Sequence, residues 1–88
     1  RILIIEDEPG NRTVLRSRLA DQGYEAVAVE SGAQGLAEAR AGEYDLLLVS
    51  ATLASGIDSL EVCRRLKAAP ETLGLPLVLF SNRAGGPE

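Results

Sequence analysis

Four polar side chains stand at the ends of predicted strands, where they could bind a hard cation or act as nucleophiles. Glu6 and Asp7 follow the first apolar run, Ser50 the third and Ser81 the fourth. Adjacent carboxylates suit Mg²⁺, which prefers carboxylate and water oxygens. They would equally suit a solvated loop before a helix N-terminus. A serine hydroxyl is a strong nucleophile only beside an activating base, and the chain has no histidine.

The elements that would position these side chains are short apolar strands alternating with amphipathic helices. Strands are predicted at 2–5, 24–29, 46–49 and 77–80. The predicted helices begin at or after Pro9, Ser31 and Asp58, and they end at Gly23, at Gly42 and before Pro70. This βαβαβαβ order favours a parallel α/β sheet that is covered on both faces. In such a sheet, ligands bind at the carboxyl ends of the strands, where these polar side chains lie.

Helical periodicity also predicts which side chains face the core. The apolar candidates on the first and third helices are Val14, Leu15, Leu19, Leu60, Cys63 and Leu66. Cys63 is expected to be a small buried hydrophobe rather than a redox sensor. The basic residues Arg64, Arg65 and Lys67 are expected to form a solvated patch, or a docking site for an acidic partner.

Composition restricts the function further. The 88 residues suffice for one domain, with a net charge of −4 and scattered basic residues, so direct nucleic-acid binding is not expected. No apolar run reaches the ~20 residues of a membrane span. A single cysteine suits the reducing cytoplasm. Because the chain opens at Arg1 directly before a strand, we expect it to be an excerpt of a longer protein.

The blocks ILIIEDEPGNR, DQGYEAVAVESG, YDLLLVS, SLEVCRRLKAAPET and LPLVLFSN occur in order over nearly the whole chain. Together they resemble the bacterial response-regulator receiver (chemotaxis-type) domain. The resemblance implies a flavodoxin-like, doubly wound parallel sheet of five βα units. Residues 1–88 would then supply strand order 2-1-3-4 as a partial receiver-like domain, without the last helix, strand and helix. The fourth strand would become an exposed edge through which the fragment could self-associate.

The same resemblance implies roles for the polar positions. In the family, a histidine kinase phosphorylates an aspartate at the end of the third strand, and that position is Ser50 here. The Mg²⁺-binding acidic pair falls on Glu6 and Asp7, and the hydroxyl that contacts the phosphoryl group falls on Ser81. The family's lysine follows a fifth strand, which the sequence does not include. With the phosphoacceptor aspartate lost, we expect no required cofactor and at most a weak Mg²⁺ site.

The loop after Ser50 departs from the family as well. The family usually has three residues after the acceptor and then Pro-Gly-x-Asp-Gly. This loop is one residue longer and lacks the proline, and its inserted region, a candidate partner contact, is Ala54, Ser55, Gly56 and Ile57. The combination is similar to atypical receivers of the myxobacterial gliding-motility type, although a neutral loop insertion would look the same.

The sequence therefore predicts a cytoplasmic, non-enzymatic pseudo-receiver that acts through protein partners, without contact to nucleic acid or membrane. Two alternatives remain. One is a phosphorylation-competent receiver that uses Ser50 or another acceptor, and the other is a small-molecule sensor that uses the vacated crevice.

Overall fold

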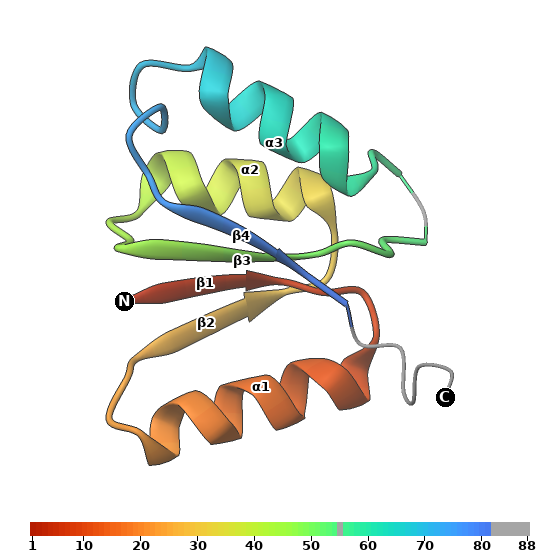
Figure 1. The fold of residues 1–88 in the computed structure, drawn as a ribbon, viewed down its shortest axis with the longest axis vertical. Coiled ribbons are helices and arrows are strands. Elements are labelled where there is room, and N and C mark those ends of the chain that lie inside the picture. Colours follow the sequence, from red (N-terminus) through yellow and green to blue (C-terminus); the bar gives the residue numbers. More distant parts are fainter. Residues whose placement is uncertain (55, 82–88) are drawn as a thin grey trace.

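The sheet of the computed structural model, which describes residues 1–54 and 56–81, is parallel and has the strand order β2-β1-β3-β4 (Figure 1). In chain order, the described elements are β1 (Ile2–Ile5), α1 (Pro9–Asp21), β2 (Ala26–Val29), α2 (Gly32–Ala41), β3 (Leu46–Ser50), α3 (Ser59–Ala68) and β4 (Leu77–Phe80). Helix α1 lies on one face of the sheet, and α2 and α3 lie on the other (Figure 1). The predicted doubly wound α/β architecture and strand order are confirmed.

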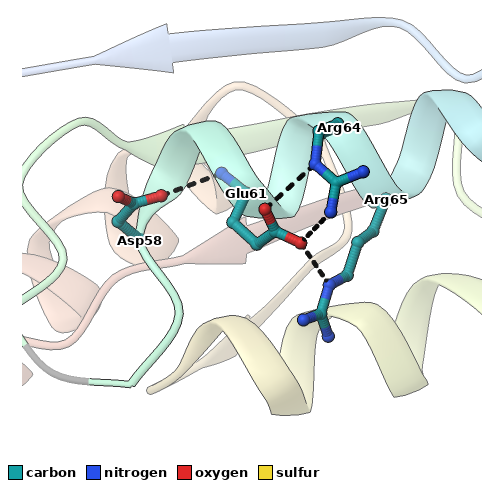
Figure 2. Close-up of polar contacts among 4 residues, drawn as sticks. All are labelled: Asp58, Glu61, Arg64 and Arg65. Atoms are coloured by element: carbon teal, nitrogen blue, oxygen red, sulfur yellow. Dashed lines mark hydrogen bonds and ion pairs between the residues drawn. The ribbon is translucent and has the colours of Figure 1, made fainter.

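Side-chain caps fix where the helices begin. Ser31 Oγ accepts a hydrogen bond from the Gln34 N–H at 3.1 Å, and Asp58 Oδ1 accepts one from the Glu61 N–H at 2.9 Å. Each satisfies one of the N–H groups that a helix start leaves unpaired. The Glu61 carboxylate accepts hydrogen bonds from Arg64 and Arg65 (Figure 2).

The core lies between the sheet and the α2–α3 layer. Its buried members are Leu3, Ile5, Leu36, Ala39, Leu47, Val49, Val62 and Leu66. Helix α2 approaches β1 closely at Gly35, where an added Cβ would lie 2.2 Å from Ile5 Cδ1. The absence of a side chain at Gly35 therefore sets the distance between helix and sheet.

Several predicted core positions were wrong. Leu60 is 69% exposed and Val14 is 49% exposed, and Cys63 is only half-buried. On α3 the buried stripe instead runs through Ser59, Val62 and Leu66, and Leu60 lies about 200° around the helix from Val62. Strand β2 also begins two residues later than predicted.

Strand β4 is an edge strand in the described part of the chain, since it pairs only with β3. Val78 and Leu79 are 46% and 43% exposed, and they point to opposite faces because they are adjacent in a strand. On the α1 face, a largely apolar hollow of about 410 Å³ also opens, lined by Arg1, Ile2, Leu19, Tyr24, Asp45, Leu46 and Leu48. The predicted exposed edge and the predicted apolar surface beside β1 and β3 are thus both present. Of the helices described, none has the length and apolarity needed to cross a membrane.

Candidate functional site

Parallel pairing brings the predicted site residues to one edge of the sheet. Strands β1 and β3 pair with Ile5 opposite Val49, so the next residues lie side by side, Glu6 directly after β1 and Ser50 as the last residue of β3. Ser50 lies opposite Phe80 in β4, and the Ala51 N–H donates a hydrogen bond to the Phe80 carbonyl oxygen at 2.8 Å. Ser81 follows directly, on the same edge. The arrangement fits the predicted crevice, and the phosphoryl-contacting role of Ser81 stays a prediction.

Glu6 is a buried carboxyl group in this crevice, with an exposed fraction of 1%. Its Oε2 accepts a hydrogen bond from the Glu8 N–H at 2.9 Å, and its backbone oxygen accepts one from Arg12 Nη1 at 2.9 Å. Burial raises the pKa of Glu6, against the opposing effect of hydrogen bonds from the Glu8 N–H and the Ser50 hydroxyl. Glu6 therefore holds its proton more tightly than an ordinary glutamate.

Asp7 behaves in the opposite way. Its Oδ2 accepts a hydrogen bond from the Ala54 N–H at 2.7 Å, across 47 residues of sequence. This bond is the main cause that lowers the pKa of Asp7, and the positive charge of Arg12 adds to it. The acidic pair thus consists of one carboxyl group that resists ionisation and one that favours it.

Ser50 is fully buried at the end of β3. Its Oγ lies 3.3 Å from Thr52 Oγ1 and 3.3 Å from the Thr52 nitrogen, so both contacts are long. Glu6 is its titratable hydrogen-bond partner. A carboxylate is a weak base for an alcohol, because effective general bases have pKa values near the operating pH. Ser50 itself is a neutral hydroxyl, and its activation as a nucleophile would depend on Glu6.

A surface cavity of about 420 Å³ opens beside the acidic pair and is lined by Glu6, Asp7, Glu8, Pro9, Asn11, Thr52 and Ala54. Its three carboxylates each accept a backbone hydrogen bond, from Glu8, Ala54 and Asn11 respectively. Within the described ranges, no group of three or more His, Cys, Asp or Glu side chains is arranged to hold a metal ion.

The inserted loop region is only partly available to a partner. Ala54 and Gly56 are exposed, and Gly56 has a φ of +72°, a conformation that favours glycine. Ile57 is half-buried against the core, so less of its surface is free than the sequence suggested. Ser55 lies outside the described residues.

The sequence analysis missed Arg12 and Thr52 as parts of this site. Arg12 is half-buried, and its guanidinium donates a hydrogen bond to the Glu6 carbonyl oxygen. Its position, one turn into the helix that follows the acidic pair, was the available signal. Thr52 stands two residues after Ser50, a spacing at which a serine hydroxyl commonly meets the backbone N–H of a turn.

The basic patch on α3 is partly neutralised within its own helix. Glu61 accepts hydrogen bonds from Arg64 Nε at 3.0 Å and from Arg65 Nε at 2.7 Å (Figure 2). Hydrogen bonds from Arg64 and Arg65 lower the pKa of Glu61 to about 2. One carboxylate offsets only one of the two guanidinium charges, so Arg64, Arg65 and Lys67 together keep a net positive charge, and a docking role for an acidic partner stays a prediction.

Sequence comparison identifies a family. The model of the response regulator receiver domain matches residues 2–86. The transcriptional activator protein IrlR of Burkholderia pseudomallei is 43% identical over 83 residues, which cover 94% of this chain and 34% of the relative. The chain thus spans about a third of the length of the curated relatives that it matches.

Solved structures give the same fold. The response regulator protein TrrA of Thermotoga maritima, in complex with Mg²⁺–BeF, is 30% identical with a TM-score of 0.86, and the match covers 96% of this chain and 70% of that one. The receiver domain of a sensor histidine kinase from Pseudomonas aeruginosa PAO1 has a magnesium ion in its active-site cleft. It is 29% identical with a TM-score of 0.84, over 97% of this chain and 70% of that one.

Proposed function

The chain belongs to the response regulator receiver domain family, and on that premise we propose that it is a pseudo-receiver. It does not accept a phosphoryl group, it is not an enzyme, and it acts through protein partners in cytoplasmic signal transduction. One observation carries this proposal. Ser50, a buried neutral hydroxyl, stands at the end of β3 beside the acidic pair, where the family has its phosphoacceptor aspartate.

The chemistry of this position supports the proposal. An aspartate would supply an anionic nucleophile and a ligand for the cation, whereas Ser50 supplies neither and has no strong base beside it. Phosphoryl transfer also depends on cations that neutralise developing charge. Lys67 is an exposed residue of α3, and the cationic side chain that lies beside the acidic pair is Arg12.

The competing function is a phosphorylation-competent receiver, which the Mg²⁺–BeF complex of the Thermotoga relative favours. Incubation with acetyl phosphate or a histidine kinase and Mg²⁺ separates the two functions. We expect no incorporated phosphate by mass spectrometry and no response to beryllofluoride in NMR spectra. A beryllofluoride-induced shift centred on Glu6, Asp7, Ser50 and Ser81 would contradict the pseudo-receiver and support the alternative.

We further propose that the 88-residue fragment self-associates through the edge of β4, which is an edge strand in the described part of the chain. Within the described residues β4 pairs with β3 alone, and it has apolar side chains on both faces, which is the combination that favours strand addition. Sedimentation velocity should show concentration-dependent self-association. Val78→Lys should suppress it, whereas Val14→Lys, at a similarly exposed valine on α1, should leave it intact. A monomer at all concentrations, or equal effects of both variants, would contradict this surface.

A further inference from the structure

We infer that the Ala54 N–H takes the place of a cation at Asp7, so that the loop between β3 and α3 holds the acidic pair without metal. The carrying observation is the 2.7 Å hydrogen bond from the Ala54 nitrogen to Asp7 Oδ2. A hydrogen bond to a charged carboxylate is stronger than one between neutral groups. The inference rests on the proposed function, because it explains how the crevice is organised in a receiver without its acceptor aspartate.

The residue type at position 54 makes this contact possible. Ala54 is the fourth residue after Ser50, which is where the family pattern usually has proline. Proline has no backbone N–H and cannot donate a hydrogen bond. The replacement of proline by alanine thus creates a donor at the one loop position that reaches Asp7. It accompanies the loss of the acceptor carboxylate at Ser50.

The other carboxylates of the cavity are held in the same manner. Glu6 accepts from the Glu8 N–H at 2.9 Å, and Glu8 itself caps α1 by accepting from the Asn11 N–H at 2.9 Å. Mg²⁺ demands near-octahedral oxygen ligands and loses its water reluctantly. Three carboxylates of the cavity already accept backbone hydrogen bonds, and Ser50 is a neutral hydroxyl. The crevice therefore offers Mg²⁺ few anionic ligands in exchange for the water that it would lose.

A cation and the loop therefore compete for Asp7. An ion that binds Asp7 through Oδ2 has to displace the Ala54 N–H, and this would release the loop segment from Thr52 to Ala54 from the end of β1. Loop position and metal occupancy become linked, because each state excludes the other. Ala54 is in this sense a specificity-determining residue that disfavours the metal.

The linkage is tested by Mg²⁺ titrations followed by NMR on the wild-type chain, Ala54→Pro and Ala54→Gly. Removing the donor with proline should tighten Mg²⁺ binding by roughly three- to tenfold, the range for loss of one partly exposed charge-assisted hydrogen bond. Glycine retains the N–H and should bind as weakly as the wild type. Equal affinities in folded Ala54→Pro and Ala54→Gly would overturn the inference.

Amide hydrogen exchange gives an independent measurement that needs no proline. Asp7→Ala should accelerate exchange of the Ala54 amide several-fold, whereas Asp21→Ala, at an exposed aspartate of α1, should not. Saturating Mg²⁺ should accelerate the same amide in the wild-type chain. Unchanged exchange at Ala54 in Asp7→Ala would refute the contact in solution. Phosphorylation of Ser50, by contrast, would contradict only the proposed function and leave these results untouched.

Discussion

Restoring a carboxylate at position 50 should destabilise the fold in the absence of metal. Ser50 is fully buried and hydrogen-bonded to Glu6, which is itself 1% exposed. In Ser50→Asp two carboxylates would stand within about 5 Å of each other, and at an effective dielectric constant of about 20 their repulsion is about 3 kcal/mol. That is a large fraction of the ~5–15 kcal/mol that stabilises a small domain.

The matched control is Ser50→Asn, which has the shape of the aspartate variant but no charge. Urea denaturation followed by circular dichroism in EDTA should give Ser50→Asp a free energy of unfolding about 3 kcal/mol below that of Ser50→Asn at neutral pH. If Ser50→Asp binds Mg²⁺ with a Kd of about 1 mM, about 10 mM Mg²⁺ should raise its free energy of unfolding by about 1.4 kcal/mol. The free energy of unfolding of Ser50→Asn should not change. The third carboxylate adds an anionic oxygen ligand, so Mg²⁺ should bind the aspartate variant more tightly.

Two outcomes would refute this reasoning. Equal stability of Ser50→Asp and Ser50→Asn in EDTA would show that the side chain at position 50 does not face the acidic pair. Equal stabilisation of the wild-type chain and Ser50→Asp by Mg²⁺ would show that Glu6 and Asp7 hold the ion without a third carboxylate. Neither variant is expected to restore switching, because Ala54 and the loop are a separate departure.

Three further predictions concern the core and the buried acid. Leu66→Ala should lower the free energy of unfolding by about 2–5 kcal/mol and Leu60→Ala by less than about 0.5 kcal/mol, because Leu66 is buried and Leu60 is exposed. Gly35→Ala should lower the free energy of unfolding by about 1–3 kcal/mol, because the added methyl group clashes with the Ile5 side chain, whereas a Cβ at Gly74 meets no atom within 4 Å. Urea denaturation of all four variants measures both differences. A reversed order of stability within either pair would contradict the packing. Because the folded pKa of Glu6 is raised, its contribution to stability is present below the ordinary value of 4.5 and is lost as pH rises through the folded pKa. Glu6→Gln should therefore be more stable than the wild type at neutral pH and lose this advantage in acid, and a pH-independent difference would contradict the assignment.

The sheet could be predicted from the sequence because its signals are local and redundant. Each strand is a short apolar run, and each helix begins at a residue whose side chain caps it, as Ser31 and Asp58 do. Parallel strands then bring their ends to one edge, so the positions of Glu6, Asp7 and Ser50 followed from the strand boundaries alone.

What could not be predicted depends on contacts between distant segments. Leu60 was placed in the core because a three-residue spacing through Cys63 to Leu66 resembles the true stripe, and only packing against the sheet selects Val62 instead. The contact between Asp7 and Ala54 joins residues 47 apart, and it involves a backbone N–H that every non-proline residue has. No pattern of residue types in the sequence predicts such a hydrogen bond.

In the proposed pseudo-receiver, the loss of phosphotransfer and the retention of the fold would have a common physical basis. Along β1 and β3 the core residues Leu3, Ile5, Leu47 and Val49 lie within the strands, whereas the acidic crevice starts only where the strands end. Removing a carboxylate from that buried edge takes away no core contact, and it relieves repulsion on Glu6, whose burial already disfavours its charge. The proposed pseudo-receiver is therefore expected to be more stable with Ser50 than with an aspartate at this position. The donor from Ala54 then holds the remaining charge of Asp7 without an ion.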